Sequence, residues 1–317
     1  MHEPSLLRIL PDVVAALSNR VPIVALESSV FAQGLPIPHN RTAATAMTGA
    51  ISSRGVLPAI AAVVRGVPTM GMEQHELERF LARDGIRKVS ARDLGVAVAT
   101  GQDGATTVAA TLALSTLAGV RVFATGGIGG VHRDPSIDES ADLNELARSP
   151  LVVVCAGAKA ILDLPATVER LETLGIPVIG YGTSELPGFF TAETGLPVSG
   201  RADSPGEVAR IVGAHFGLGR RSAILIVIPP PAQFALTRAR VEKAVERALK
   251  EARSRGVRGA GVTPMLLAEV ERETDGASLA ANLALLERNA AVAADIAIAA
   301  RDVLEESIEL GGVRMVQ

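Results

Sequence analysis

Lys159 follows the wholly apolar run Leu151–Ala158 in a chain that has only four lysines against 27 arginines. Arginine keeps its proton in proteins, whereas a lysine beside a buried strand can lose its proton and become an amine nucleophile. The setting therefore suggests covalent chemistry through a neutral amine. Residue type alone favours the alternative, a lysine at a helix start whose stem lies along apolar surface while its ammonium reaches solvent.

Glu27 is a second candidate, because it directly follows the expected strand Pro22–Leu26. Ligands collect at the carboxyl ends of parallel strands, where loops can be polar without disturbing the core. Partial burial would raise the pKa of such a carboxylate towards the range useful for proton transfer. A carboxylate that caps the following loop is an equally good interpretation of this residue alone.

A glycine-rich segment, Ala124-Thr-Gly-Gly-Ile-Gly-Gly130, follows another expected strand and leads to His132. Glycines allow a ligand to approach the backbone closely and expose amide donors that suit an anion. The spacing is not the G-x-G-x-x-G pattern of dinucleotide-binding loops. His132 is a candidate for ligand contact, although it could also be a structural histidine.

The polar stretch Ile137–Leu146 holds several carboxylates, among them Asp138 and Asp142. Hard oxygen ligands of this kind suit magnesium or manganese, which often keep several waters when one carboxylate binds them. Alternatively, Ser140 caps a helix that begins near Asp142, and the residues alone favour this interpretation. Both roles can coexist in one segment.

Two further segments are candidate walls of a site for an anion. Lys88 precedes Ser90 and Arg92, which could together hold a phosphate. Asp103 and the run 106–108, which ends at Val108, follow a glycine-containing turn and lead into a helix of small residues.

Short β-branched runs alternate with longer alanine-rich helical patterns, as in parallel strands joined by crossover helices. We expect a three-layer α/β/α sandwich with a mainly parallel central sheet. The expected strands are Pro22–Leu26, Ala59–Val64, Val120–Ala124, Leu151–Cys155, Pro177–Gly180 and Ala223–Ile228. The expected helices are Arg41–Arg54, Glu73–Asp84, Ala105–Leu117, Asn144–Arg148, Ala160–Leu174 and Pro205–His215.

The C-terminal part from about residue 232, beyond Pro229-Pro-Pro231, has helical spacing, chiefly over Ala232–Arg253 and Ser278–Glu306. No linker separates this segment from the sheet, so we expect residues 1–317 to form a single domain.

Composition narrows the classes of function. An apolar fraction of 48% is ample for a deep core, and a net charge of −3 with scattered basic residues argues against nucleic acid as a partner. The single cysteine, Cys155, excludes an internal disulfide and lies in an expected buried strand. Neither a secretory signal nor a bilayer-length apolar segment is apparent, so the cytoplasm is the expected compartment and no membrane partner is expected.

Taken together, these segments resemble the pseudouridine-5′-phosphate glycosidase family. The resemblance runs in order through ALESS, RKVSARDL, TTVAAT, FATGGIGGVHR, SADLNEL, VVVCAGAKAILDLPAT, VIGYGTSELPGFF and SLAANLALLERNA, and so covers almost the whole chain. One departure is Glu139, where the family's metal segment would have an apolar residue, and it leaves open whether a second carboxylate joins that segment.

The resemblance implies reversible cleavage of the carbon–carbon glycosidic bond of pseudouridine 5′-phosphate, which gives uracil and ribose 5-phosphate. Lys159 would form an imine with the sugar, Glu27 would donate or accept a proton, and Asp142 would assist proton transfer. Asp138 would hold a divalent ion, usually manganese, with magnesium as an alternative. The residues implied in substrate contact are Lys88, Val108, Ser140, Ala141, Asp142, His132 and Asn282. A homotrimer that uses the late helices is also implied.

The chemistry of a carbon glycoside gives these roles a reason. Such a bond has no electronegative leaving atom, so its cleavage needs an electron sink at the anomeric carbon and a proton for the uracil carbon. Two other functions remain open from the residues. Another Schiff-base lyase of sugar phosphates would keep Lys159 and the anion site, whereas a non-catalytic sugar-phosphate or nucleotide sensor would need no neutral amine.

Overall fold

A central sheet of 11 strands organises the computed structural model, which describes residues 6–133, 138–255 and 262–304. The strand order is β1-β4-β3-β2-β7-β9-β13-β11-β12, with β6 beside β3 and β5 beside β6. Every pairing in this sheet is parallel except those of β3 with β4 and β6. The sheet strands are β1 (Arg8–Ile9), β2 (Ile23–Glu27), β3 (Leu57–Val64), β4 (Val67–Met70), β5 (Arg87–Val89), β6 (Gly104–Thr106), β7 (Val122–Ala124), β9 (Val152–Cys155), β11 (Val178–Tyr181), β12 (Gly200–Ala202) and β13 (Ile224–Val227).

A second, two-stranded antiparallel sheet joins β8 (Val131–His132) to β10 (Leu162–Asp163). The helices are α1 (Pro11–Ser18), α2 (His39–Ser52), α3 (Gln74–Ala82), α4 (Leu94–Ala99), α5 (Val108–Ala118), α6 (Ala141–Leu146), α7 (Leu164–Thr173), α8 (Pro205–Gly217), α9 (Arg238–Ser254), α10 (Val262–Glu273) and α11 (Ala277–Ala299). A π-helical turn, η1 (Val30–Gly34), and a 3-10 turn, η2 (Ala91–Asp93), complete the described elements.

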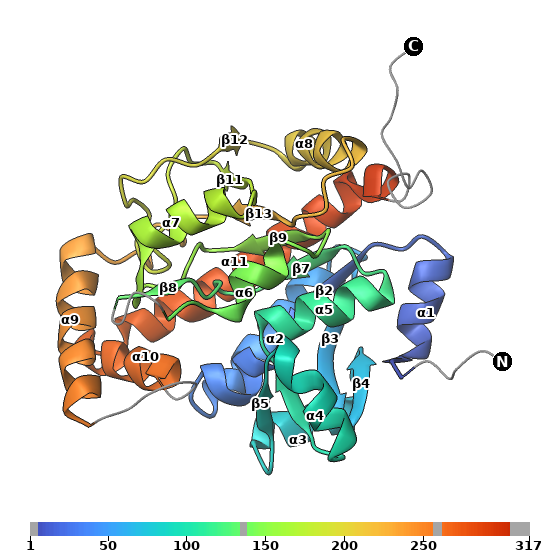
Figure 1. The fold of residues 1–317 in the computed structure, drawn as a ribbon, viewed down its shortest axis with the longest axis horizontal. Coiled ribbons are helices and arrows are strands. Elements are labelled where there is room, and N and C mark those ends of the chain that lie inside the picture. The colour runs from blue at the N-terminus through green and yellow to red at the C-terminus, as the bar shows by residue number, and fades with distance from the viewer. Residues whose placement is uncertain (1–5, 134–137, 256–261, 305–317) are drawn as a thin grey trace.

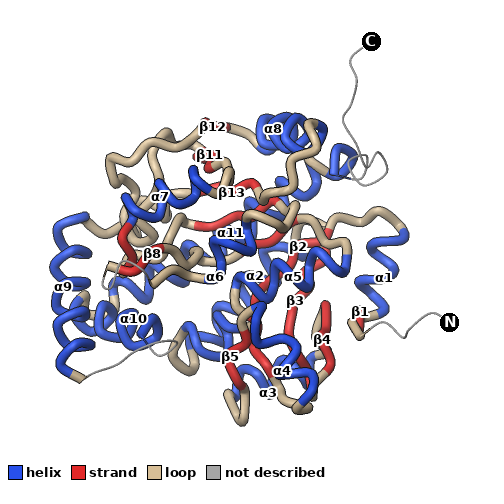
Figure 2. The backbone as a smooth tube through the Cα atoms, viewed as in Figure 1, coloured by secondary structure: helices blue, strands red, loops and turns tan. Residues whose placement is uncertain are grey.

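Helices cover both faces of the sheet. The long helix α11 packs against α2, α8 and strands β2, β7 and β9, whereas α5 packs against α6 and strands β2, β3 and β4. In Figure 1, α5 and α6 lie in front of the strands and α11 passes behind them, while α9 and α10 stand together at one end. Figure 2 shows the strands of the sheet between these helices. The expected three-layer α/β/α sandwich is confirmed.

The core strands have the composition that burial on both faces requires. Every residue of β2, β9 and β13 is buried, and β9 and β13 are continuous apolar runs, as is typical of central parallel strands. Each fully buried aliphatic side chain contributes roughly 1.5–3 kcal/mol. No helix in the described ranges is long and apolar enough to cross a membrane.

The six expected strands match observed strands to within two residues at each end. The helix expected from Ala105 begins only at Val108, because Ala105 belongs to strand β6 and pairs there with Ala62 of β3. The helix expected from Ala160 begins at Leu164, because residues 162–163 pair with β8 as strand β10. In both places a short strand directly precedes a helix and has a similar composition of small or apolar residues. The strand forms because it pairs with a distant segment, which the local sequence does not show.

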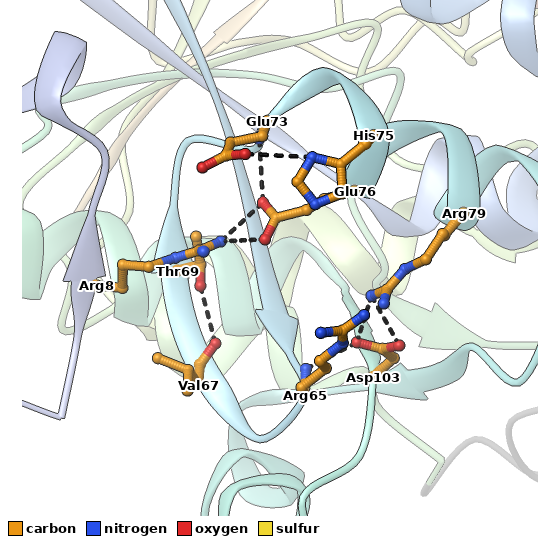
Figure 3. A network of polar contacts seen from close by, with 9 residues as sticks. All are labelled: Arg8, Arg65, Val67, Thr69, Glu73, His75, Glu76, Arg79 and Asp103. Carbon is orange, nitrogen blue, oxygen red and sulfur yellow. Dashed lines mark hydrogen bonds and ion pairs between the residues drawn. The ribbon is translucent and has the colours of Figure 1, made fainter.

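Arginine–carboxylate pairs join segments at the edge of the sheet (Figure 3). Arg8 of β1 donates to both carboxylate oxygens of Glu76 in α3, at 2.7 Å each. Arg79 donates to Asp103 at 2.9 Å, and the backbone N–H of Arg65 donates to the same carboxylate at 2.7 Å. Asp103 therefore binds Arg65 and Arg79 at the edge of the sheet. The structure does not support its expected role in the wall of an anion site.

Candidate active site

Three neighbouring parallel strands bring the main candidate residues to one edge of the sheet. Strands β2, β7 and β9 are adjacent and run in the same direction. Glu27 ends β2, the glycine-rich segment begins after Ala124 of β7, and Lys159 follows Cys155 of β9 by four residues. Residues far apart in the sequence therefore share the edge where parallel sheets place their ligands.

Glu27 is 4% exposed and held by two hydroxyl groups. Ser29 Oγ donates to Glu27 Oε2 at 2.5 Å, and Thr125 Oγ1 donates to Oε1. Burial raises the pKa of Glu27 above its ordinary value, although the charge of Lys159 and the two hydroxyls oppose the shift. A carboxyl group with a raised pKa can hold a proton closer to neutral pH and act as an acid.

Lys159 lies in a loop that the neighbouring glycine-rich segment fixes. Its backbone N–H donates to the carbonyl of Ile128 at 3.1 Å, directly after a bridge between Ile128 and Ala158. Gly157 has φ of +87°, and a Cβ there would lie 2.4 Å from the Pro187 carbonyl oxygen, so this turn requires glycine. Among the described residues, no side chain forms a hydrogen bond or ion pair with the Lys159 amine.

Asp142 connects two backbone segments at the site. Its Oδ2 accepts from the Gly129 N–H at 2.8 Å, and its Oδ1 accepts from the Ala109 N–H at 2.9 Å. A Cβ at Gly129 would lie 2.2 Å from Ser140 Oγ, so glycine is required for this approach. Ser140 caps α6 by accepting from the Asp142 N–H, as the residues alone favoured.

Lys88 is brought to the same place by β5, where it pairs with Ala105 of β6. Burial lowers the pKa of Lys88, the charge of Lys159 lowers it further, and Glu27 and Asp142 act in the opposite direction. These interactions place two cations and two carboxylates within electrostatic reach of one another.

Among the other expected substrate contacts, Val108 is buried and begins α5, next to the Ala109 amide that binds Asp142. Ala141 is exposed and begins α6. His132 is half-buried and pairs with Leu162, three residues beyond Lys159.

The expected metal ligand, Asp138, has an exposed side chain, and its carbonyl accepts from the His132 N–H at 2.9 Å. Its neighbour Glu139 pairs with Arg170 at 2.9 Å, so this carboxylate is engaged with α7. The described residues contain no group of three or more metal-binding side chains. A single open carboxylate still fits a hard divalent ion that keeps most of its waters.

Asn282 lies in the wall of a cavity of about 280 Å³. The cavity also has Gln33, Arg83 and Phe190 in its wall, and α10 and α11 add apolar side chains together with Glu271 and Ser278. Gln33 Oε1 and two guanidinium nitrogens of Arg83 are buried and have no hydrogen-bond partner in the part of the chain that the structure describes. The wall therefore combines apolar, charged and amide side chains.

Sequence reasoning missed several residues at the site. Ser29 and Thr125 bind Glu27, Asn289 of α11 binds the Thr125 carbonyl, and Gln33 lies in the cavity with Asn282. The strand-end rule gave a signal for Ser29 and Thr125, which closely follow β2 and β7. Asn289 lies in the motif SLAANLALLERNA and on a segment with helical spacing, but neither shows its contact with Thr125, 164 residues away.

Cys155 ends β9 near Lys159, and burial raises the pKa of its thiol to about 12. We expect the native protein to resist Ellman's reagent at pH 8, because a buried neutral thiol is a poor nucleophile. After unfolding in guanidinium, one thiol per chain should react. Rapid reaction of the folded protein, with its circular dichroism unchanged, would contradict the observed burial.

A buried glutamate with a raised pKa at the carboxyl end of a parallel strand, together with Lys159 and Asp142 beside it, indicates the class of this protein, an α/β enzyme. Comparisons with known proteins narrow this class. The family described as Indigoidine synthase A like protein matches residues 12–299. The chain belongs to this family and, by its relatives below, to the pseudouridine-5′-phosphate glycosidases.

A pseudouridine-5′-phosphate glycosidase of Gemmatimonas aurantiaca is 60% identical over 90% of this chain and 94% of its own length. A pseudouridine-5′-phosphate glycosidase of Escherichia coli is 46% identical over 93% of this chain and 95% of its own length. Among solved structures, the prealnumycin C-glycosynthase AlnA, in complex with ribulose 5-phosphate, is 37% identical with a TM-score of 0.88. That alignment covers 96% of this chain and 100% of AlnA.

Proposed function

We propose that the protein is a pseudouridine-5′-phosphate glycosidase that cleaves the carbon–carbon glycosidic bond reversibly through an imine on Lys159. The observation that carries the proposal is that Glu27 and Lys159, which lie at the ends of strands of one parallel sheet, meet Asp142 of α6. Relatives with this activity in their names and the sugar phosphate bound to AlnA support it.

The proposed reaction begins with opening of the ribose ring. Glu27 gives a proton to the ribose ring oxygen as the bond between that oxygen and C1′ breaks, and the neutral Lys159 amine forms a bond to C1′. The ionised Glu27 then takes a proton from the new C1′ ammonium, which restores the nitrogen lone pair. That lone pair forms the imine while the electrons of the C1′–uracil bond move to the uracil carbon, which takes the proton back from Glu27. Water hydrolyses the imine, which releases ribose 5-phosphate and restores the amine.

The remaining charged groups have proposed roles that follow from their positions. Asp142, whose carboxylate is held by two backbone amides, assists proton transfer. Lys88 and the N-terminus of α5 at Val108 bind the phosphate, since cations and free helix amides favour anions. Asp138 would hold a divalent ion, manganese or magnesium, which would help to orient the anionic substrate.

We also propose that the cavity beside Asn282 receives the uracil ring. Turn η1 begins three residues after Glu27 and carries Gln33 into the cavity wall. Uracil has apolar faces and an edge of N–H donors and carbonyl acceptors. The apolar walls fit its faces, Gln33 Oε1 can accept from a ring N–H, and Arg83 can donate to a carbonyl.

The activity is tested by mixing the protein with uracil, ribose 5-phosphate and Mn²⁺ and separating pseudouridine 5′-phosphate by chromatography. No product from protein with intact circular dichroism would contradict the proposed function. A different Schiff-base enzyme on sugar phosphates is the second candidate, because AlnA is a C-glycosynthase. It would bind ribose 5-phosphate covalently and fail to use uracil.

Replacing Gln33 by leucine should raise KM for uracil about tenfold in the synthetic direction, because one buried hydrogen bond to the ring is lost. KM for ribose 5-phosphate should change little. Gln74→Leu, at an exposed position of α3, is the matched control and should leave both values unchanged. Equal changes in the two KM values of Gln33→Leu would place the base elsewhere.

The assembly and the compartment are also proposals. The homotrimer and the cytoplasmic location rest on the family resemblance.

A further inference from the structure

Asn289 is an unusual residue for its position in the fold. It lies on α11, is 1% exposed, and is surrounded along the helix by buried apolar residues, including Leu285, Leu286 and Ala290. Burying a polar amide costs free energy unless it forms hydrogen bonds. The bonds that Asn289 does form therefore indicate what the residue is for.

The amide of Asn289 faces the segment that follows β7. Its Nδ2 donates to the Thr125 carbonyl at 2.9 Å and to the Gly126 carbonyl at 3.4 Å. Both neighbours are acceptors, so the nitrogen must face them and the amide cannot be reversed. Asn289 Oδ1 is buried and has no hydrogen-bond partner among the residues that the structure describes. The side chain is thus placed for its donors alone, at the expense of an unsatisfied oxygen.

Thr125 connects Asn289 to Glu27. Its backbone N–H donates to the Val154 carbonyl of β9 at 3.0 Å, and its hydroxyl donates to Glu27 Oε1. The chain Asn289–Thr125–Glu27 therefore runs from the covering helix to the proposed acid. Leu285 and Leu286 of the same helix also lie against Gly126, where a Cβ would meet them at 3.5 and 3.1 Å.

We propose that Asn289 is a positioning residue, which holds Thr125 so that its hydroxyl binds Glu27 and sets the proton affinity of that carboxyl group. The inference rests on the proposed function, in which Glu27 is the acid. Other groups act on Glu27 from the packed elements around it: Ser29 after β2, Lys159 after β9, Asp142 of α6 and, more weakly, Lys88 of β5. None of these four residues is bonded to Asn289. A substitution of Asn289 therefore tests only the contribution of the Thr125 hydroxyl to Glu27.

The hydroxyl of Thr125 stabilises the ionised form of Glu27, and its loss should raise the pKa of Glu27 further. In Asn289→Ala, we expect the limb of the pH–rate profile that belongs to Glu27 to move to higher pH. We expect kcat to fall about ten- to hundredfold, because the acid is misplaced, with KM within about threefold of the wild type. Asn289→Ser, which keeps a donor at shorter reach, should show the same shift to a smaller extent and perturbs packing less.

The coupling is measured by a double-mutant cycle with Thr125→Val, which removes the same hydroxyl directly. If Asn289 acts through Thr125, the double variant should be no slower than Thr125→Val, and its pH profile should be the same. Additive losses in kcat would overturn the proposal, as would an unmoved pH profile in both Asn289 variants. A wild-type protein without activity would instead refute the proposed function.

Asn40 supplies the matched control. It is likewise fully buried, and its Nδ2 donates to two backbone carbonyls, those of Phe31 at 3.0 Å and Leu81 at 2.9 Å. Asn40→Ala should lower the melting temperature at least as much as Asn289→Ala, since it removes these two hydrogen bonds and the one that Asn40 Oδ1 accepts from the Arg41 N–H. Asn40→Ala should leave the pH–rate profile unchanged. A shift of the profile equal to that of Asn289→Ala would show that a general loss of stability, and not the positioning of Thr125, causes the effect.

Discussion

Lys159→Ala is expected to lower kcat at least about a thousandfold, because it removes the amine that forms the proposed covalent bond to the sugar. Lys159→Arg should fail to the same extent, because arginine keeps the positive charge but provides no nucleophile. A sensor protein, which would use only the charge, should tolerate arginine. The rate of pseudouridine 5′-phosphate cleavage, followed by chromatography of uracil, measures both variants.

Borohydride reduction separates an imine from simple binding. With ribose 5-phosphate present, reduction should fix one sugar phosphate on Lys159, identified by mass spectrometry of the peptide, and none in Lys159→Ala. Lys250→Ala, at an exposed position of α9, is the matched control and should keep both activity and trapping. Trapping at Lys88 in place of Lys159 would contradict the assignment of the nucleophile, because both amines lie at the site.

Glu27→Gln is expected to lower kcat by about two to four orders of magnitude, the range typical of a lost general acid. The amide keeps the shape of the side chain: its oxygen can accept from one of the two hydroxyls, and its NH2 can donate to the oxygen of the other, so the fold should be retained. The pH profile of the residual activity should lose the limb that belongs to Glu27. A variant with near wild-type kcat would assign the proton to another group.

The same substitution should change stability with a defined sign. Burial raises the pKa of Glu27 above its ordinary value of 4.5, so the native protein holds this proton to higher pH than the unfolded chain does. The unfolding free energy of the wild type therefore falls, through this group, as pH rises from about 4.5 past the raised pKa. Glu27→Gln lacks this loss, and its stability relative to the wild type should increase with pH in chemical denaturation.

Glu76→Gln is the control of opposite sign. Burial opposes ionisation of Glu76, but hydrogen bonds from Arg8 and from the Glu73 N–H outweigh it and hold its pKa below the ordinary value. Its contribution is present at neutral pH and is lost as pH falls below about 4.5 through the lowered pKa. This variant should be less stable than the wild type at pH 7 and approach it in acid. Parallel pH trends in the two variants would contradict the assigned shifts.

The structure explains which parts of the fold were predictable. Strands such as Val152–Cys155 are continuous apolar runs that must be buried on both faces, so sequence pattern alone locates them. The strand Gly104–Thr106 has no such pattern, because it exists through pairing with β3 and β5. The turn η1 and strand β10 were missed for the same reason, since their conformations depend on distant segments.

For the candidate site, the sequence determined the chemical groups. A lysine after a buried strand, a glutamate at a strand end and an aspartate near a helix start are visible as residue types in local patterns, and the ordered motifs relate them to one family. Because the carboxyl ends of parallel strands share an edge, their approximate meeting place also followed from the sequence.

Only the tertiary structure decided how these groups are tuned and supported. The pKa of Glu27 depends on how deeply it is buried and on the hydroxyl of Thr125, which lies 98 residues away. Asn289 reaches that threonine from a helix that the sequence describes only as apolar. Burial and hydrogen bonds between distant segments set proton affinity, and such quantities arise only when the chain is packed.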